Sequence, residues 1–487
     1  MKRIISKIVF VALFSSAIIS CNDATDIVQK SELNEDVAFQ SVEDLQTGLN
    51  GVYAQYGPDF GGNGDGDVIL FNDLFTDNIK RGAASNNQGA TEYNFILQPA
   101  TDFPARIWGN RYATINYANR VLRAADRITA DLTNPAEIAQ ANHIRGQLLA
   151  LRGLCHFDLL QYFTEDYEDP NGLAVIIMDF VPEIEQSFER NTVSEVFEFV
   201  NNDLVTAKAL LDGSQEDIFY ITPDAVDAMR ARVALFQGNY SLAETLAEEL
   251  VEKYPLANQT QYLDMWADGL SSELIWSLSR VANDNAVAGL FYANETDIDG
   301  SPFFEMSNQL YNLYEDGDVR KIAFVDETSI IVGENSPENV ILINKYPGSV
   351  QNLVNDIKMF RSSEMQLIAA ECQARDGRFA EAIASLQALR NARYGEGAPE
   401  VPEFTNLTAA LTEVLVERRK ELAFEGHRFL DLKRIGREIG IGIDRLEVDA
   451  ASFTAQTDLS PTDYRFTMPI PQAELNANNV ITQNPGY

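Results

Sequence analysis

Glu421 and Glu425 lie one helical turn apart in the segment 417–434, and Arg418 and Arg428 flank them. Two neighbouring carboxyl groups can act as general acid and general base, the arrangement that glycoside hydrolysis requires. Arginines placed at three- and four-residue steps lower the pKa of both carboxyl groups, however, and leave neither poised to donate a proton. We therefore predict that these four residues share one helix stripe as a structural ion-pair network, with no catalytic role.

Motifs of the common enzyme classes are missing from the sequence. It holds no nucleophile elbow, phosphate-binding loop, zinc-protease motif or dinucleotide fingerprint. His143, His156 and His427 are far apart, and no Cys/His cluster suggests zinc. This pattern favours a binding protein over an enzyme, and a lipid-anchored glycoside hydrolase is the remaining catalytic alternative.

Two stretches without helical periodicity combine aromatic rings with Asp, Asn and Arg side chains. This mixture suits sugars, because an aromatic ring packs on the C–H face of a sugar while polar groups bind its hydroxyls. The same side chains could accept a peptide, and the acidic clusters could hold a structural calcium ion; no other cofactor is predicted. The candidate ligand-binding residues are Tyr56, Phe60, Asp67, Asn72, Asp73, Asp77, Arg81 and Tyr93 in the first stretch, and Arg280, Asn283, Asp284, Asn285, Phe291 and Tyr292 in the second.

The charge of the chain restricts its partners. Its 73 acidic and 37 basic residues give a net charge of −36. A surface this acidic repels phosphate backbones, so nucleic acid is excluded as a partner. Neutral and cationic ligands and divalent cations remain compatible with it.

The first 21 residues carry a targeting signal. Lys2, Arg3 and Lys7 precede an apolar run over residues 8–14, followed by small residues up to Cys21. This run is too short to span a membrane, and its end resembles a bacterial lipobox. The resemblance implies that residues 1–20 are a cleaved signal peptide and that Cys21 is acylated. Residues 21–36 then form a flexible polar tether to a lipid-anchored globule at the outer membrane.

The candidate residues depend on a scaffold that is mainly helical. Helical periodicity predicts helices over 41–56, 105–128 and 135–163, and further helices that begin at Thr192 and Thr222. Two helical hairpins, at 231–254 and 371–390, resemble tetratricopeptide repeats, and such hairpins must stack on one another to bury their apolar faces. Residues 273–279 look like a short strand, whereas 67–101, 280–302 and 326–348 show little regular pattern.

Several side chains are expected in the core of this scaffold. Phe71 and Phe75 are four residues apart among leucines, and Trp108 and Trp276 fall inside periodic elements. Cys155 and Cys372 lie among apolar neighbours and are expected to be buried free thiols, with one disulfide as the alternative.

Several motifs in a fixed order make the chain recognisable. They are Asp318-x-Arg320, Arg361 to Glu371, Leu389 to Arg393, Glu417 to Arg434, Met468 to Pro471 and Gln483 to Tyr487, with Tyr112 to Asn119 nearer the start. Together with the lipobox, they are similar to the signature of the SusD/RagB family over nearly the whole chain. The resemblance implies one SusD-like domain over residues 37–487, with an N-terminal part to about 300 and the signature region from about 301.

The family resemblance also implies a function. It implies a mainly α fold in which tetratricopeptide-type hairpins form the scaffold, and irregular loops with minor β elements form the ligand face. The implied role is a cell-surface lipoprotein without catalysis, which captures oligosaccharides and delivers them to a TonB-dependent outer-membrane barrel of the SusC/RagA type. Peptide capture, as implied by RagB, is the alternative. No family binding motif matches the candidate ligand residues one by one.

Overall fold

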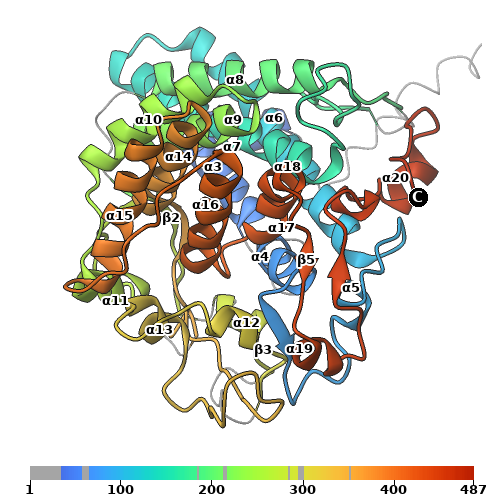
Figure 1. Cartoon of the computed structure of the whole chain (residues 1–487). Helices are drawn as coiled ribbons and strands as arrows, with labels where there is room; N and C mark the ends of the chain where they lie inside the picture. The colour runs from blue at the N-terminus through green and yellow to red at the C-terminus, as the bar shows by residue number, and fades with distance from the viewer. Residues whose placement is uncertain are drawn as a thin grey trace, which may run out of the picture.

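A computed structural model describes residues 35–57, 65–183, 186–211, 217–282, 284, 286–293, 301–349 and 353–487. The signal peptide, Cys21 and most of the predicted tether lie outside these residues. Helices make up most of the described chain, and strands are few and short (Figure 1). The longer helices are α3 (Val42–Tyr56), α4 (Asp65–Leu74), α6 (Asp102–Asp131), α7 (Pro135–Phe163), α8 (Val193–Leu210), α9 (Pro223–Phe236), α10 (Tyr240–Lys253), α11 (Gln259–Trp266), α14 (Ser362–Arg375), α15 (Phe379–Tyr394) and α16 (Leu407–Leu422).

Consecutive helices pack on one another as a continuous array. Helix α6 packs on α7, α7 on α8, α8 on α9, α9 on α10, α10 on α14, and α14 on α15 and α16. The predicted hairpins are α9–α10 and α14–α15, with turns at Gly238 and Gly377. Stacking α10 on α14 joins the two hairpins although more than a hundred residues separate them. The mainly helical prediction with stacked hairpins is therefore confirmed.

Helix starts follow their capping signals. Ser41 and Asp44 form a capping box at α3, and Thr192 and Glu195 form another at α8. In each box the hydroxyl accepts a bond from the third backbone N–H, and the acid accepts one from the cap N–H. These reciprocal bonds satisfy donors that a helix start leaves unpaired, so both boundaries could be read from the sequence.

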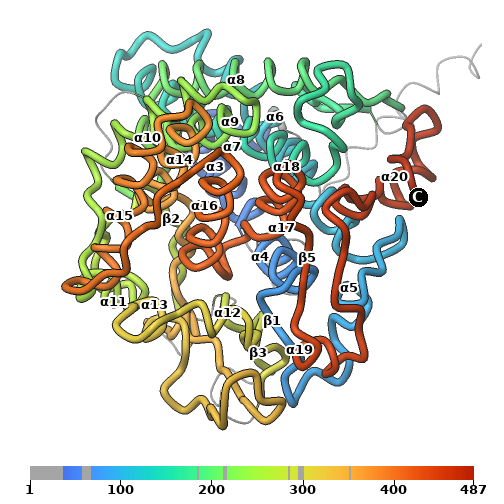
Figure 2. The backbone as a smooth tube through the Cα atoms, viewed as in Figure 1, coloured from blue at the N-terminus to red at the C-terminus, as the bar shows by residue number. Residues whose placement is uncertain are grey.

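The short strands pair into three two-stranded sheets. Strand β1 (Ile79–Arg81) pairs antiparallel with β3 (Phe304–Met306), β2 (Leu274–Leu278) with β4 (Ile357–Arg361), and β5 (Ile443–Asp444) with β6 (Asp458–Leu459). Figure 2 shows residues 301–349, in yellow to light orange, along the lower edge beside β1. This region also holds the short helices α12 (Asn308–Tyr311) and α13 (Val319–Phe324), and it carries turns and isolated bridges, as predicted for 326–348. The remaining short elements are α2 (Glu35–Ala38), α5 (Ala90–Tyr93), α17 (Arg428–Asp431), a π-helical turn (Leu432–Gly436), α18 (Arg437–Ile439), α19 (Glu447–Ala451) and α20 (Gln472–Ala477), with 3₁₀ turns at Val287–Leu290 and Tyr464–Phe466.

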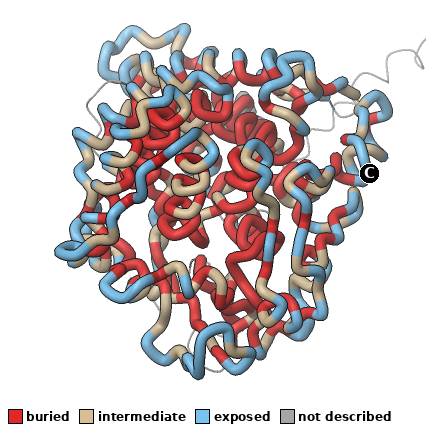
Figure 3. Tube along the Cα trace, in the orientation of Figure 1, coloured by how far each residue is buried: buried red, intermediate tan, exposed pale blue. Residues whose placement is uncertain are grey.

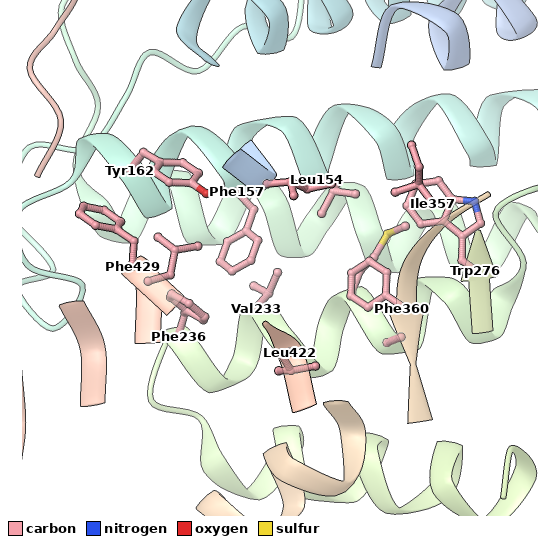
Figure 4. Close-up of a cluster of buried hydrophobic side chains, with 14 of the residues drawn as sticks. Leu154, Phe157, Tyr162, Val233, Phe236, Trp276, Ile357, Phe360, Leu422 and Phe429 are labelled. Carbon is pink, nitrogen blue, oxygen red and sulfur yellow. The ribbon is translucent and has the colours of Figure 1, made fainter. Parts of the chain in front are cut away.

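Buried residues run through the centre of the helical array, and exposed residues follow its rim (Figure 3). Figure 4 shows part of this core, where Phe157 of α7 meets Phe236 of α9 edge to face, with ring centroids 5.4 Å apart. Trp276 of β2 stacks on Phe360 of β4 at 6.2 Å. Trp108, Phe71 and Phe75 are buried, as expected, and so is Trp266, whose environment the sequence left undecided. Cys155 and Cys372 are both buried, as expected, and no disulfide joins them.

Two predictions about helices are wrong. Residues 67–101 contain helix α4, whose apolar residues face several neighbours at once, so it shows no one-sided period. The segment from Glu417 is not one helix, because α16 ends at Leu422. The chain then turns through Phe424 and Gly426, which both have positive φ. Gly426 comes so close to α4 that an added Cβ would lie 3.3 Å from Val68.

Candidate functional site: an aromatic groove

An open groove of about 480 Å³ lies between the end of α3, the loop before α9 and the chain that leaves β2. Its size is in the range of pockets that hold small organic ligands. We call it the tyrosine groove. It is lined by Asn50, Tyr53, Ala54, Gly57, Asp217, Phe219, Tyr220, Leu278, Ser279, Arg280 and Asp284.

Two tyrosines form its aromatic wall. The ring of Tyr53 meets that of Tyr220 edge to face, with centroids 5.9 Å apart, and both are half-buried. The Tyr53 hydroxyl donates to Gln147 Oε1 at 2.7 Å and accepts from the Ile221 backbone N–H at 2.9 Å. Burial raises the pKa of Tyr53, so it stays a neutral donor. Because the second bond ties the loop before α9 to α3, the wall is held rigid before any ligand binds.

Polar residues also line the groove. The backbone N–H of Arg280 donates to Asp356 Oδ1 at 2.7 Å, and Asp284 Oδ2 accepts from the Val281 N–H at 2.8 Å. The Arg280 guanidinium lies over Gly57, where an added Cβ would be only 3.1 Å from Nη2. Asn50 and Asp217 are exposed at the edge. Aromatic faces beside charged and amide groups are the combination that the chemistry of sugar binding requires.

Only part of the predicted ligand set reaches this groove. Arg280 and Asp284 line it, whereas Phe60, Asn283 and Asn285 lie outside the described residues. Phe291 and Tyr292 are buried, and the Tyr292 hydroxyl donates to the Ile343 carbonyl at 2.7 Å. These two residues belong to the core, and the prediction that they contact a ligand is corrected.

The polar residues predicted in the first stretch are also structural. Asn72 is fully buried, donates to the Tyr162 hydroxyl at 2.6 Å and accepts from the Phe429 N–H. Asp77 forms ion pairs with Arg419 and Arg428 at 3.3 and 2.8 Å. Burial alone would raise the pKa of Asp77, but the two guanidinium groups outweigh it and lower that pKa to about 2.

At Asp67 and Asp73 the effect of burial outweighs that of the polar partners. Burial raises the pKa of Asp67 to about 6 despite its ion pair with Arg106 at 3.1 Å. Asp73 Oδ1 accepts bonds from Asn78 and from the Phe424 N–H, while Oδ2 is buried with no hydrogen-bond partner. Burial raises the pKa of Asp73 to about 7. Neither side chain is presented to a ligand.

Three further predicted ligand residues are held by cation–π contacts. Tyr56 is buried under the Arg111 guanidinium, 4.6 Å from the ring centroid, and faces an interior cavity. Tyr93 is buried under Arg445 at 3.8 Å. Arg81 donates to Ser85 Oγ and the Ser452 carbonyl, and lies over the Phe453 ring. Side chains of the protein thus cover the rings of Tyr56 and Tyr93 and engage the Arg81 guanidinium, so none of the three is open to a sugar.

The sequence did not point to Tyr53, Phe219 and Tyr220. Tyr53 lies three residues before Tyr56 on the same helix, so either tyrosine could have faced the groove. Phe219 and Tyr220 form an aromatic pair just before the Thr222–Pro223 helix start. An aromatic pair in a loop next to a well-capped helix was the available signal.

The predicted ion-pair residues lie in a buried charge network. Glu421 accepts bonds from Arg361, Arg393 and Arg320, and its carboxylate is fully buried. Burial would raise the pKa of Glu421, but these arginines outweigh it and hold the pKa well below its usual range. Glu421 therefore cannot supply a proton as a general acid.

The other three members have different partners. Glu425 pairs with Lys345 and Arg361, Arg418 with Asp431, and Arg428 with Asp77. The four residues thus pair with side chains outside their own set and do not neutralise one another along a helix stripe. Glu273 adds a further carboxylate between Arg361 and Arg393.

Neither a metal cluster nor a membrane-spanning helix is found in the part of the chain that the structure describes. No three His, Cys, Asp or Glu side chains within it are grouped so that they could hold a metal ion. Among the same residues, no helix combines the length and the apolar character needed to cross a bilayer.

Known proteins share both the sequence and the fold. Residues 320–487 match the model of the SusD family, and residues 26–235 match a model described as starch-binding and associating with the outer membrane. The SusD-like protein P2 of Formosa agariphila is 24% identical over 531 residues, covering 99% of each chain. A SusD superfamily protein from Bacteroides thetaiotaomicron has a TM-score of 0.77 at 26% identity, covering 92% of this chain and all of that one.

A SusD-like carbohydrate binding protein from Bacteroides vulgatus gives a TM-score of 0.74 at 23% identity, covering 91% of this chain and 98% of that chain. The descriptions of these similar proteins name starch or carbohydrate binding and no enzyme activity, which favours a binding role over the hydrolase alternative. The two family models cover both ends of the chain, and the helical array agrees with the solved structures. In both sequence and fold, the chain is similar to the SusD/RagB family.

Proposed function

We propose that this protein binds neutral glycan oligomers in the tyrosine groove. The observation that carries the proposal is that a rigid Tyr53–Tyr220 pair and the polar residues Arg280 and Asp284 line the same groove. The net charge of −36 disfavours polyanionic ligands, because a strongly acidic surface repels them. A neutral sugar meets no such repulsion and can use both the tyrosine rings and the polar residues.

The proposed role in the cell is capture for import. Acylation of Cys21 would anchor the protein in the outer membrane, with the helical domain facing the exterior. A TonB-dependent barrel of the SusC/RagA type would then receive the bound oligomer. The match to a family that associates with the outer membrane supports this arrangement. In the importer, the helical array would contact the barrel, and binding without chemistry would be the whole contribution of this chain.

Isothermal calorimetry on the full chain in detergent tests the proposal. The probes are oligosaccharides of four to eight units from starch, xylan and mixed-linkage glucan, beside a panel of peptides. We expect Tyr220→Ala to weaken glycan binding about tenfold, because it removes half of the aromatic wall. Tyr117→Ala is the matched control, since Tyr117 is a 46% exposed tyrosine on α6 that does not line the groove.

Each outcome of this titration is informative. Glycan affinity that falls in Tyr220→Ala but is unchanged in Tyr117→Ala supports the groove as the glycan site. Binding of peptides alone would replace the glycan proposal with the RagB-like alternative. Equal glycan affinity in the wild-type chain and both variants would show that sugars bind elsewhere.

A further inference from the structure

A second surface hollow, of about 440 Å³, lies where residues 95–99 meet the last turns of the chain. We call it the C-terminal hollow. It shares no lining residue with the tyrosine groove. Its lining is Phe95, Ile96, Leu97, Gln98, Pro99, Tyr464, Arg465, Gly486 and Tyr487.

The final segment of the chain is firmly held beneath this hollow. Asn484 is buried, accepts from Arg190 Nη1 at 2.8 Å, and donates to the carbonyls of Phe163 and Met468 at 2.9 and 2.7 Å. The Gln483 side chain bonds to both backbone groups of Ile470. The chain end is therefore a fixed part of the fold, so the hollow does not depend on a mobile tail.

Tyr464 forms an exposed aromatic platform on this base. It is 46% exposed, although its ring packs directly against the backbone of Gly486. An added Cβ at Gly486 would lie 2.4 Å from the ring, and the φ of Gly486 is +95°, so only glycine fits under Tyr464 without strain. Tyr487 meets Tyr464 at 5.0 Å and 73°, and its hydroxyl donates to the Thr467 carbonyl at 2.8 Å. An exposed ring fixed in this way loses little entropy when a ligand binds.

Oriented polar groups stand beside the platform. Arg465 donates to both carboxylate oxygens of Asp463 at 2.8 Å, and its third nitrogen donates to the Phe95 carbonyl at 3.2 Å. Hydrogen bonds from Arg465 lower the pKa of Asp463, so the pair stays charged at neutral pH. Gln98, with an exposed amide side chain, lies on the same hollow. Paired acceptors and donors next to an open ring match the hydroxyls and the C–H face of a sugar.

We propose that the C-terminal hollow is a second glycan-contact site, which holds another stretch of the same neutral polysaccharide that the tyrosine groove binds. This inference rests on the proposed function of the groove. Two separate contacts on one chain make the second binding event intramolecular, which raises avidity for long polymers. An oligomer too short to reach both sites gains nothing from the hollow.

Affinity electrophoresis of the full chain, in gels that contain soluble starch, xylan or mixed-linkage glucan, tests this inference. We expect Tyr464→Ala and Gln98→Ala to weaken retention by the polysaccharide that retards the wild-type chain, by about three- to tenfold. Because Gln98 is exposed, Gln98→Ala is expected to fold normally. It therefore still tests the hollow if Tyr464→Ala folds poorly. Calorimetry with a tetrasaccharide should give the same affinity for both variants as for the wild-type chain, and Tyr117→Ala should leave retention unchanged.

Failure of this inference can be told apart from failure of the groove proposal. If retention is unchanged in both hollow variants while Tyr220→Ala still weakens tetrasaccharide binding, the hollow proposal alone is overturned. If the wild-type chain binds neither the polysaccharides nor the oligosaccharides, both the hollow proposal and the groove proposal are overturned. Loss of tetrasaccharide binding in the hollow variants would make the hollow the primary site and contradict the division of roles proposed here.

Discussion

Replacing Glu421 with alanine is expected to lower the free energy of unfolding by about 3–5 kcal/mol. Glu421 accepts five hydrogen bonds, from Arg361, Arg393, Arg320 and Tyr262, inside a fully buried cluster. Without the Glu421 carboxylate, the buried guanidinium groups lose part of the negative charge that balances them. Water cannot reach this cluster to solvate them instead. Urea unfolding followed by circular dichroism measures the effect.

Glu249→Ala is the matched control for this substitution. Glu249 also lies in the interior of a helix, α10, but is exposed, and alanine there should change stability by no more than about 0.5 kcal/mol. Glu421→Gln keeps the shape and some of the hydrogen bonds, so its loss should fall between the two. A Glu421→Ala chain as stable as the Glu249→Ala chain would contradict the structural role assigned to the network.

The second large effect is a gain in stability from Asp73→Asn that depends on pH. Burial raises the pKa of Asp73 from 3.8 to about 7, so the folded chain keeps this proton between those values while the unfolded chain releases it. The stability that Asp73 contributes is therefore present below pH 3.8 and lost as pH rises toward 7. Asparagine does not titrate, and its amide oxygen can accept the same bonds from Asn78 and Phe424.

The advantage of Asp73→Asn over the wild-type chain should consequently grow by about 2–3 kcal/mol between pH 5 and pH 8. Urea unfolding at the two pH values gives this difference directly. Asp131→Asn, at an exposed position at the end of α6, should show no comparable growth. The prediction is contradicted if the stability difference between Asp73→Asn and the wild-type chain is the same at both pH values, or if Asp73→Asn is the less stable chain at pH 8. Either result would show that Asp73 is ionised at little cost in the folded protein.

The helical scaffold was accessible from the sequence because its signals are local. Capping boxes at Ser41 and Thr192, and the turn glycines of the two hairpins, fix boundaries within a few residues of chain. Helix α4 was not accessible, because contacts on several faces replace the one-sided period by which a surface helix is recognised.

The ion-pair partners could not be predicted for a related reason. Arg418, Glu421, Glu425 and Arg428 were placed together by helical spacing, yet the chain leaves the helix after Leu422. Their actual partners, among them Asp77, Lys345 and Arg361, are far away in sequence. Only the packed fold brings these charges together.

The structure places members of the two candidate stretches in different surroundings. Arg280 and Asp284 reach the tyrosine groove, whereas Asn72, Asp73 and Asp77 are internal to the fold. Polar residues among aromatics are as typical of a buried hydrogen-bonded layer as of a sugar site. Burial distinguishes the two cases, and it depends on tertiary packing that spacing does not report.

The most direct test of the central claim is an experimental structure of the protein saturated with the oligosaccharide that calorimetry selects. The account predicts that the sugar lies in the tyrosine groove, with one ring packed on Tyr53 or Tyr220 and hydroxyls within hydrogen-bond distance of Arg280 or Asp284. A sugar bound at full occupancy elsewhere, with the groove filled by solvent alone, would contradict it.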